Sequence, residues 1–154
     1  MTLTGLVSLR LLERIIVVEI TFDLDTSPVG KLPGKFEKAK ALGLKYAAQD
    51  MTRFLMQNSP VDHGLLRQWF IESIDDEQAT IKSPAKYAIY QDQGTRPYLI
   101  YPNKKKALFW PGAEHPVKFV AHPGIEGKHF VQNSFEQLQP LVPGYWMKAL
   151  EEVD

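Results

Sequence analysis

Apolar and polar side chains alternate strictly between residues 18 and 24, near the N-terminus of the chain. Because successive side chains of a strand point to opposite faces, this alternation predicts a strand with one buried face. Residues 25–34 contain two prolines and two glycines and are predicted as a loop. The apolar positions of the strand are Val18, Ile20, Phe22 and Leu24.

The apolar spacing changes to three and four residues between positions 35 and 58. This spacing predicts one long helix with a single buried stripe. Pro60 ends the helix, because the residue before a proline is pushed out of the helical region. The stripe consists of Phe36, Ala39, Gly43, Ala47, Met51, Phe54 and Leu55.

Strand-forming composition returns after this helix. Residues 65–74 are rich in Leu, Trp, Phe and Ile and are predicted as a strand. The acidic residues 75–77 follow as a turn, and residues 79–82 are predicted to pair back as a hairpin. Residues 87–93 fit either a strand or one helical turn.

Residues 94–127 contain five prolines and four glycines between short apolar pieces. Residues 98–101 and 107–110 flank a charged stretch and predict a hairpin with its tip at residues 103–106. A further strand is expected where Val117, Phe119 and Ala121 share one face.

Helical spacing resumes over residues 128–138 and is expected to stop at Pro140, Pro143 and Gly144, before a last short helix over residues 145–152. The predicted fold class is α+β, with an antiparallel sheet packed against one long helix, a C-terminal helix and a long proline- and aromatic-rich hairpin loop.

The length of 154 residues predicts one domain. We expect a core over residues 15–138. Residues 1–14 have an ambiguous pattern and are interpreted as an N-terminal arm, and residues 139–154 as a C-terminal extension.

Composition removes several function classes. Hydrophobic residues make up 44% of the chain and charged residues 23%, which excludes disorder over its whole length. No cysteine is present, so a disulfide, a zinc–thiolate site and a cysteine nucleophile are excluded. With 18 basic and 18 acidic residues the net charge is zero, which does not indicate wholesale nucleic-acid binding. Charges interrupt the most apolar stretch, residues 3–20, so no membrane span is expected.

Candidate catalytic groups do not form a known motif. His115, His122 and His129 recur every seven residues, but intervening prolines and glycines exclude one continuous helix and no metal-binding spacing is present. No metal or cofactor is predicted. A small metal- or His/Asp-dependent hydrolase or nuclease stays open as an alternative, using Asp62 and His63 with His115 or His122.

A basic run lies among aromatic residues in the proline-rich region. Such a run is either a solvated tip or a contact for a partner or nucleic acid, so an accessory DNA-binding module is a second alternative. The apolar pair Tyr145 and Trp146, near the C-terminus, is a second candidate interface anchor. The candidate interface residues are Tyr98, Tyr101, Lys104, Lys105, Lys106, Trp110, Tyr145 and Trp146.

The most specific pattern lies in two predicted corners of the chain, residues 59–67 and residues 87–97. In the first, Asp62 is expected to accept hydrogen bonds from following backbone N–H groups, Gly64 to supply a positive φ, and Arg67 to project past the start of a strand at residue 65. In the second, Tyr87 and Tyr90 are expected to share the packed side of a turn.

At the end of this second corner, Gly94 permits a sharp exit and Thr95 ties down the backbone. Taken together, the two corners resemble the tail-component family of long-tailed bacteriophages, which are small neck or tail-completion proteins. That family shows a long helix, a Pro-Val-Asp-Thr-Gly-x-Leu-Arg corner and a later Tyr-Ala-x-Tyr-(Val)-Glu-x-Gly-Thr segment. The resemblance covers residues 36–138, with His63 in place of the usual Thr and Gln91 or Asp92 near the expected Glu. The matching residues are Pro60, Val61, Asp62, Gly64, Leu66, Arg67, Tyr87, Ala88, Tyr90, Gly94 and Thr95.

The resemblance implies a structural virion protein rather than an enzyme. It implies a homo-oligomeric ring, sixfold in this part of the neck, that completes the tail or joins it to the head around the DNA channel. The implied partners are head-closure or connector proteins, tail terminator or tail tube proteins, and genomic DNA in weak, non-specific contact. The implied location is the virion neck, after synthesis in the host cytoplasm.

Overall fold

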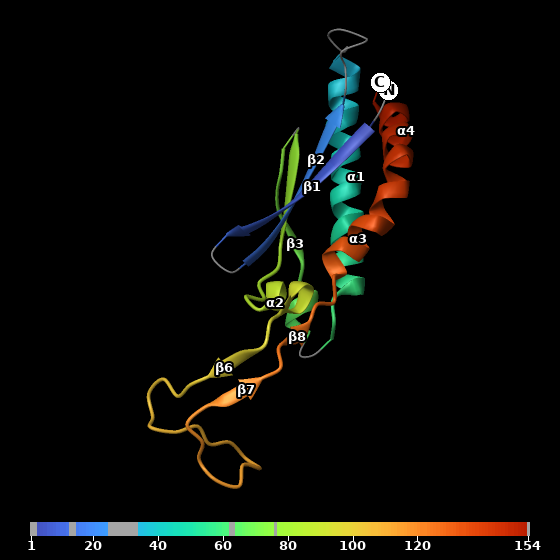
Figure 1. Cartoon of the computed structure of the whole chain (residues 1–154). Helices are drawn as coiled ribbons and strands as arrows, with labels where there is room; N and C mark the ends of the chain where they lie inside the picture. Colours follow the sequence, from blue (N-terminus) through green and yellow to red (C-terminus); the bar gives the residue numbers. More distant parts are fainter. Residues whose placement is uncertain (1–2, 13–14, 25–33, 62–63, 76, 154) are drawn as a thin grey trace.

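A computed structural model of the chain describes residues 3–12, 15–24, 34–61, 64–75 and 77–153. It combines helices with small antiparallel sheets, so the predicted α+β class is confirmed at this level. The main body is a four-stranded sheet with helices gathered on one side, and a narrow extension with two small two-stranded sheets leaves one end of it (Figure 1).

The main sheet has the order β1-β2-β4-β3 and is antiparallel throughout. Its strands are β1 (Leu3–Leu12), β2 (Ile15–Leu24), β3 (Phe70–Ile74) and β4 (Gln78–Lys82). The predicted strand at residues 18–24 and the returning strand at 79–82 are confirmed. Residues 1–14 were expected as an arm, but their described part is the edge strand β1, paired with β2 over its whole length.

The strand expected from residue 65 begins only at Phe70. Residues Leu65–Arg67 form the short 3-10 helix η1 instead, entered through Gly64 in the left-handed region with φ 79°. The prediction failed because it assigned the apolar residues here to a strand. Leu66 and Trp69 are both buried, but residues three apart do not share one strand face, and the turn at η1 brings both into the core.

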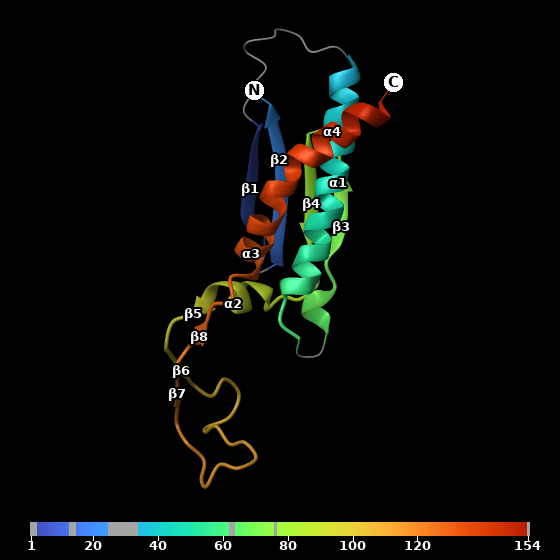
Figure 2. The same cartoon turned by 90° about the vertical axis from the view of Figure 1, so that its right-hand side faces the viewer.

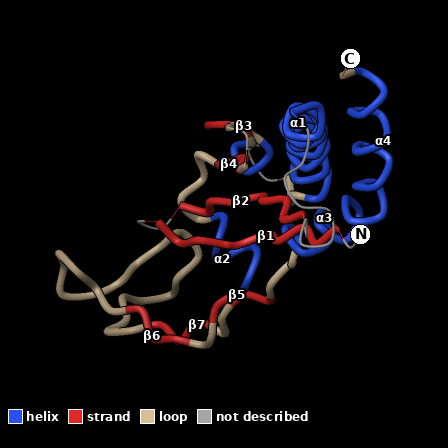
Figure 3. The backbone as a smooth tube through the Cα atoms, turned by 90° about the horizontal axis from the view of Figure 1, so that it is seen from above, coloured by secondary structure: helices blue, strands red, loops and turns tan. Residues whose placement is uncertain are grey.

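Helix α1 (Gly34–Asn58) confirms the predicted long helix and covers one face of the sheet (Figure 3). The register places Val18 opposite Ile81 and Ile20 opposite Ala79, and the β4 residues Ala79 and Ile81 are fully buried. Trp69 and Phe130 meet edge to face in this core, with ring centroids 6.2 Å apart. The buried stripe of α1 consists of Ala39, Gly43, Leu44, Ala47, Ala48, Met51, Phe54 and Leu55.

The C-terminal region remains helical through α3 (Phe130–Leu138), η2 (Gln139–Leu141) and α4 (Val142–Glu152). The predicted end of the helix at residue 138 and the last short helix are confirmed, but Pro143 and Gly144 lie in the first turn of α4 rather than in a break. Pro140 and Pro143 both occupy first-turn positions, where the missing N–H costs no helical hydrogen bond. Helix α4 lies along α1, so the expected C-terminal extension covers the body (Figure 2).

Short elements form the extension. These are α2 (Ala88–Gln93), β5 (Gly94–Thr95), β6 (Tyr98–Ile100), β7 (Val120–His122) and β8 (Ile125–Glu126). Strand β5 pairs with β8, and β6 pairs with β7. Residues 87–93 thus take the helical option.

The hairpin between residues 98–101 and 107–110 is not formed, and that pairing is wrong. Residues 98–100 pair with 120–122, and Leu108 makes an isolated bridge to Val117. A one-sided strand through Val117, Phe119 and Ala121 is also absent among these described residues, since the strand is limited to β7. Both corrections have one cause, because local alternation does not specify which of several short apolar pieces pair.

Among the described residues, no helix has the length and apolar character that a bilayer crossing requires.

Candidate functional site

Ser59 stabilises the first corner, which connects the end of α1 to η1. Its hydroxyl donates to the Leu55 carbonyl at 2.6 Å and accepts from the Trp69 indole N–H at 2.8 Å. The Arg67 Nε donates to the Ser59 carbonyl at 3.1 Å. Ser59 and Trp69 are both buried. This pair was not predicted, because its only signal in the sequence is a serine after a helix and a tryptophan ten residues later.

The motif residues of this corner divide between core and surface. Leu66 is buried, Val61 is exposed, and Gly64 has the positive φ that was expected. Arg67 is the last residue of η1 and is exposed. Asp62 and His63 lie outside the described residues, so the Asx-type turn expected at Asp62 stays a prediction.

The second corner is a close crossing of two chain segments. A Cβ atom on Gly94 would lie 2.4 Å from the Ile125 carbonyl oxygen, and one on Gly124 would lie 2.3 Å from the Thr95 carbonyl oxygen. Both glycines have positive φ, 78° and 91°. Only glycine fits such contacts. The Thr95 hydroxyl accepts from the Ile125 N–H at 3.1 Å, which confirms its expected role in tying down the backbone.

Helix α2 enters this crossing with Ala88 buried and its tyrosines outside. Tyr87 and Tyr90 are 38% and 42% exposed, so the expectation that they share a packed side is wrong. The buried side of α2 is formed by Ala88, Ile89 and Asp92. The three-residue spacing of the tyrosines was correct for a helical turn but did not indicate which side faces the core.

Asp92 connects the crossing to α3. Its side chain is 4% exposed, and its Oδ1 accepts from the Val131 N–H at 3.0 Å. Its backbone carbonyl accepts from the N–H of His129, which has the left-handed φ of 50° just before α3. A carboxylate at the start of a helix satisfies an otherwise unpaired N–H and complements the helix dipole. The base of the extension is thereby held firmly to the body.

Beyond the crossing lies the arm, defined here as residues 96–123. It projects away from the main sheet and helices (Figures 1 and 2). Tyr98 stacks on His122 with ring centroids 4.9 Å apart, and Tyr101 lies 6.1 Å from Phe119. The Gly124 N–H donates to His122 Nδ1 at 3.0 Å. The two strands of the arm are therefore held together by aromatic pairs as well as by backbone hydrogen bonds.

The arm presents much apolar surface to solvent. Tyr101 and Phe119, although paired with each other, are 62% and 53% exposed, and Phe109 is 66% exposed. The basic residues Lys104, Lys105 and Lys106 are also exposed, in the loop between β6 and the Leu108–Val117 bridge. Exposed aromatic residues beside positive charge are typical of a contact surface for another macromolecule. The candidate interface residues on this arm are Tyr98, Tyr101, Lys104, Lys105, Lys106 and Trp110.

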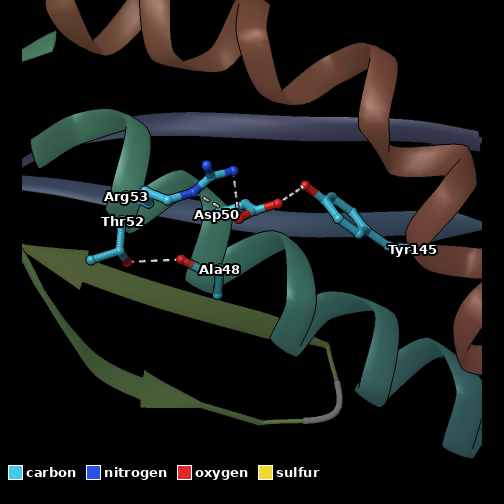
Figure 4. Close-up of polar contacts among 5 residues, drawn as sticks. All are labelled: Ala48, Asp50, Thr52, Arg53 and Tyr145. Atoms are coloured by element: carbon cyan, nitrogen blue, oxygen red, sulfur yellow. Dashed lines mark hydrogen bonds and ion pairs between the residues drawn. The ribbon is translucent and has the colours of Figure 1, made fainter. Parts of the chain in front are cut away.

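Tyr145 and Trp146 do not belong to this surface. The Tyr145 hydroxyl donates to Asp50 Oδ2, and Asp50 also pairs with Arg53 at 2.8 Å (Figure 4). Trp146 lies over Gly43 of α1, whose ideal Cβ would be 3.8 Å from its ring. Both half-buried side chains attach α4 to α1, and their role as an interface anchor for a partner stays a prediction. Burial, followed by the hydrogen bond to Asp50, raises the pKa of Tyr145.

The histidines are spread along the chain. His115 is exposed in the arm, His122 lies in the stack with Tyr98, and His129 precedes α3. Within the described ranges, no three His, Cys, Asp or Glu side chains gather as metal ligands would. The hydrolase alternative also needs Asp62 and His63, which the structure does not describe.

Comparisons of this chain with protein-family models, with curated proteins and with solved structures find no match.

Proposed function

We propose that the chain is a structural protein of a bacteriophage neck and acts through surface contacts rather than catalysis. In this role it forms a ring around the DNA channel and completes the tail or joins it to the head. The observation that supports this proposal is the arm, a two-stranded projection whose exposed residues are aromatic and basic.

A docking part needs a rigid base, because flexibility at the base would raise the entropy cost of every contact. Here the two chain segments cross so closely at Gly94 and Gly124 that no side chain fits between them. Asp92 then fixes the crossing to α3. The proline- and aromatic-rich arm is therefore presented in one orientation. A fixed orientation suits an arm that docks between neighbouring proteins of the neck.

Its partners in this proposal are copies of itself, head-closure or connector proteins, and tail terminator or tail tube proteins. Genomic DNA passing the channel makes weak and non-specific contacts. The lysines of the arm suit such contacts, whose strength falls steeply with salt concentration. Zero net charge over the whole chain limits tight retention of DNA.

The test is to locate the protein in particles. Virions produced from the genome that encodes this chain are labelled with antibody against it and viewed by electron microscopy. We expect label at the junction of head and tail, and separate heads and tails when the gene carries a nonsense codon. Particles that lack the protein, or that join normally without it, contradict the proposal.

A further inference from the structure

Charge is divided unevenly between the arm and the rest of the chain. Residues 96–123 contain five lysines and arginines and one glutamate, so the remainder carries 13 basic residues against 17 acidic ones. The five basic residues of the arm are Arg96, Lys104, Lys105, Lys106 and Lys118, and all are exposed. A neutral protein is thus basic on its projection and acidic on its body.

The β3–β4 hairpin is acidic, whereas the arm is basic. Like the arm, it carries exposed apolar side chains. Its described acidic residues are Glu72, Asp75 and Glu77, and its one basic residue, Lys82, pairs with Glu72 at 2.5 Å. The Glu77 and Gln78 N–H groups donate to Asp75 and lower its pKa, which keeps this carboxyl charged. Phe70 is 47% exposed, and the register places it on the same sheet face as Ser73, opposite to the face of the buried Ala79 and Ile81.

Strand β3 is an edge of the main sheet, and no described strand pairs with its outer side. The hairpin turn lies towards the end of the body where α1 begins, whereas the arm leaves the end where α1 stops (Figures 1 and 2). The acidic turn and the basic arm therefore lie towards opposite ends of one chain. Surfaces placed this way meet between two copies in a head-to-tail contact, which closes as a ring when the rotation allows it.

We propose that the arm of one copy docks on the β3 edge and the acidic β3–β4 turn of a second copy. The exposed aromatic residues of the arm cover Phe70, which shares its sheet face with Ser73, and its lysines face Asp75 and Glu77. This contact is made by side chains rather than by backbone pairing. The β3–β4 register shifts at Glu72, and such a bulge disfavours the addition of another strand to this edge. The inference deepens the proposed function and rests on it for its ring context.

A second copy explains more than nucleic acid does. Phosphates would account for the lysines of the arm but not for the acidic turn and the exposed Phe70 of the edge strand. Opposite charges that face each other across an interface steer association and fix its register. They also make it sensitive to salt, since exposed charges are screened over about 8–10 Å at moderate ionic strength.

The chain has no cysteine, so introduced cysteines report one contact at a time. Asn103→Cys places a thiol in the arm loop and Ser73→Cys places one on β3, both at exposed positions. The two purified variants are mixed and oxidised. We expect a disulfide-linked dimer that forms at least about tenfold faster than in a mixture of Asn103→Cys with the exposed α1 control Gln57→Cys.

Charge reversal provides the matched control. Lys104→Glu, Lys105→Glu and Lys106→Glu in the Asn103→Cys chain should slow cross-linking to Ser73→Cys about tenfold, as should raising salt from about 0.05 to 0.5 M. Lys35→Glu, Lys38→Glu and Lys45→Glu change the net charge equally on exposed positions of α1. This control should leave the rate within about twofold.

Equal cross-linking of Ser73→Cys and Gln57→Cys overturns the contact, and so does equal slowing by the two triple variants. Strong binding of a fluorescent DNA duplex that is lost only with the arm lysines would assign the arm to nucleic acid and also overturn it. The virion label is read separately. Label at the neck without selective cross-linking refutes this contact alone, whereas selective cross-linking without label refutes the neck assignment alone.

Discussion

The Asp92 carboxylate and the Val131 N–H join α2 to the first turn of α3, with 3.0 Å between Oδ1 and N. The two residues are 39 positions apart, and the whole arm lies between them. Both are buried, so no solvent replaces this hydrogen bond. The bond therefore closes the loop that carries the arm and sets where the arm leaves the body.

Asp92→Ala should lower the free energy of unfolding by about 1–3 kcal/mol, because it leaves the buried Val131 N–H without an acceptor. Urea denaturation followed by tryptophan fluorescence measures this loss. Glu136→Ala, on the exposed side of α3, is the control and should change stability by less than about 0.5 kcal/mol. Equal effects of the two changes would show that Asp92 does not hold α3.

Gly94→Ala and Gly112→Ala separate backbone strain from crowding. Both glycines have positive φ, but a Cβ atom on Gly112 meets nothing within 4 Å, whereas one on Gly94 meets the Ile125 carbonyl oxygen. Gly112→Ala should cost about 1–2 kcal/mol from φ alone. Gly94→Ala should cost clearly more, because a backbone atom must move. Thermal unfolding of both variants tests the difference, and equal losses would contradict the close crossing.

The sequence predicted the elements better than their partners. Helix α1 and strand β2 were found because each carries one uninterrupted period of apolar residues. The arm was assigned the wrong pairing, because residues 98–100, 107–110 and 117–121 are short and equally apolar. Only the closure at Gly94 and Gly124 decides between them, and it depends on segments 30 residues apart.

The residues of the candidate site could be predicted where the conformation needs one particular residue type. Gly94 and Thr95 were expected at a sharp exit and occupy one. Ser59 and Trp69 were missed, because many residues can fasten a corner and their pairing is visible only in three dimensions. The packing of Tyr145 and Trp146 on α1 was not predicted, since an apolar pair near a terminus looks the same whether it faces α1 or a partner.

Ser59→Ala should destabilise the fold by about 1–3 kcal/mol, because the buried Trp69 indole N–H loses its acceptor. Chemical denaturation measures the loss, and near-ultraviolet circular dichroism should report a changed environment of Trp69. Ser73→Ala removes a hydroxyl from an exposed position of β3 and is the matched control. If both variants unfold at the same urea concentration as the parent chain, Ser59 does not secure this corner.

Tyr145→Phe should weaken the attachment of α4 to α1 by about 1 kcal/mol at neutral pH, through loss of the hydrogen bond to Asp50. The pKa of Tyr145 is raised above its ordinary 10.0. The neutral phenol therefore stabilises the fold fully below pH 10, and this contribution is lost as the pH rises through the folded-state pKa. The stability difference between parent and variant should shrink above pH 10. Tyr101→Phe, on the exposed arm, should show neither effect.

Gly43→Ala should stabilise the protein by about 0.8–1.0 kcal/mol, because alanine restricts the unfolded chain and favours the helix. The added methyl would lie 3.8 Å from the Trp146 ring and 3.9 Å from Ala149, which are ordinary contact distances. Gly43→Leu tests the same contact from the other side, since its extra atoms must displace α4 and lower the melting temperature. A gain from both substitutions would mean that α4 does not pack on α1 at this position.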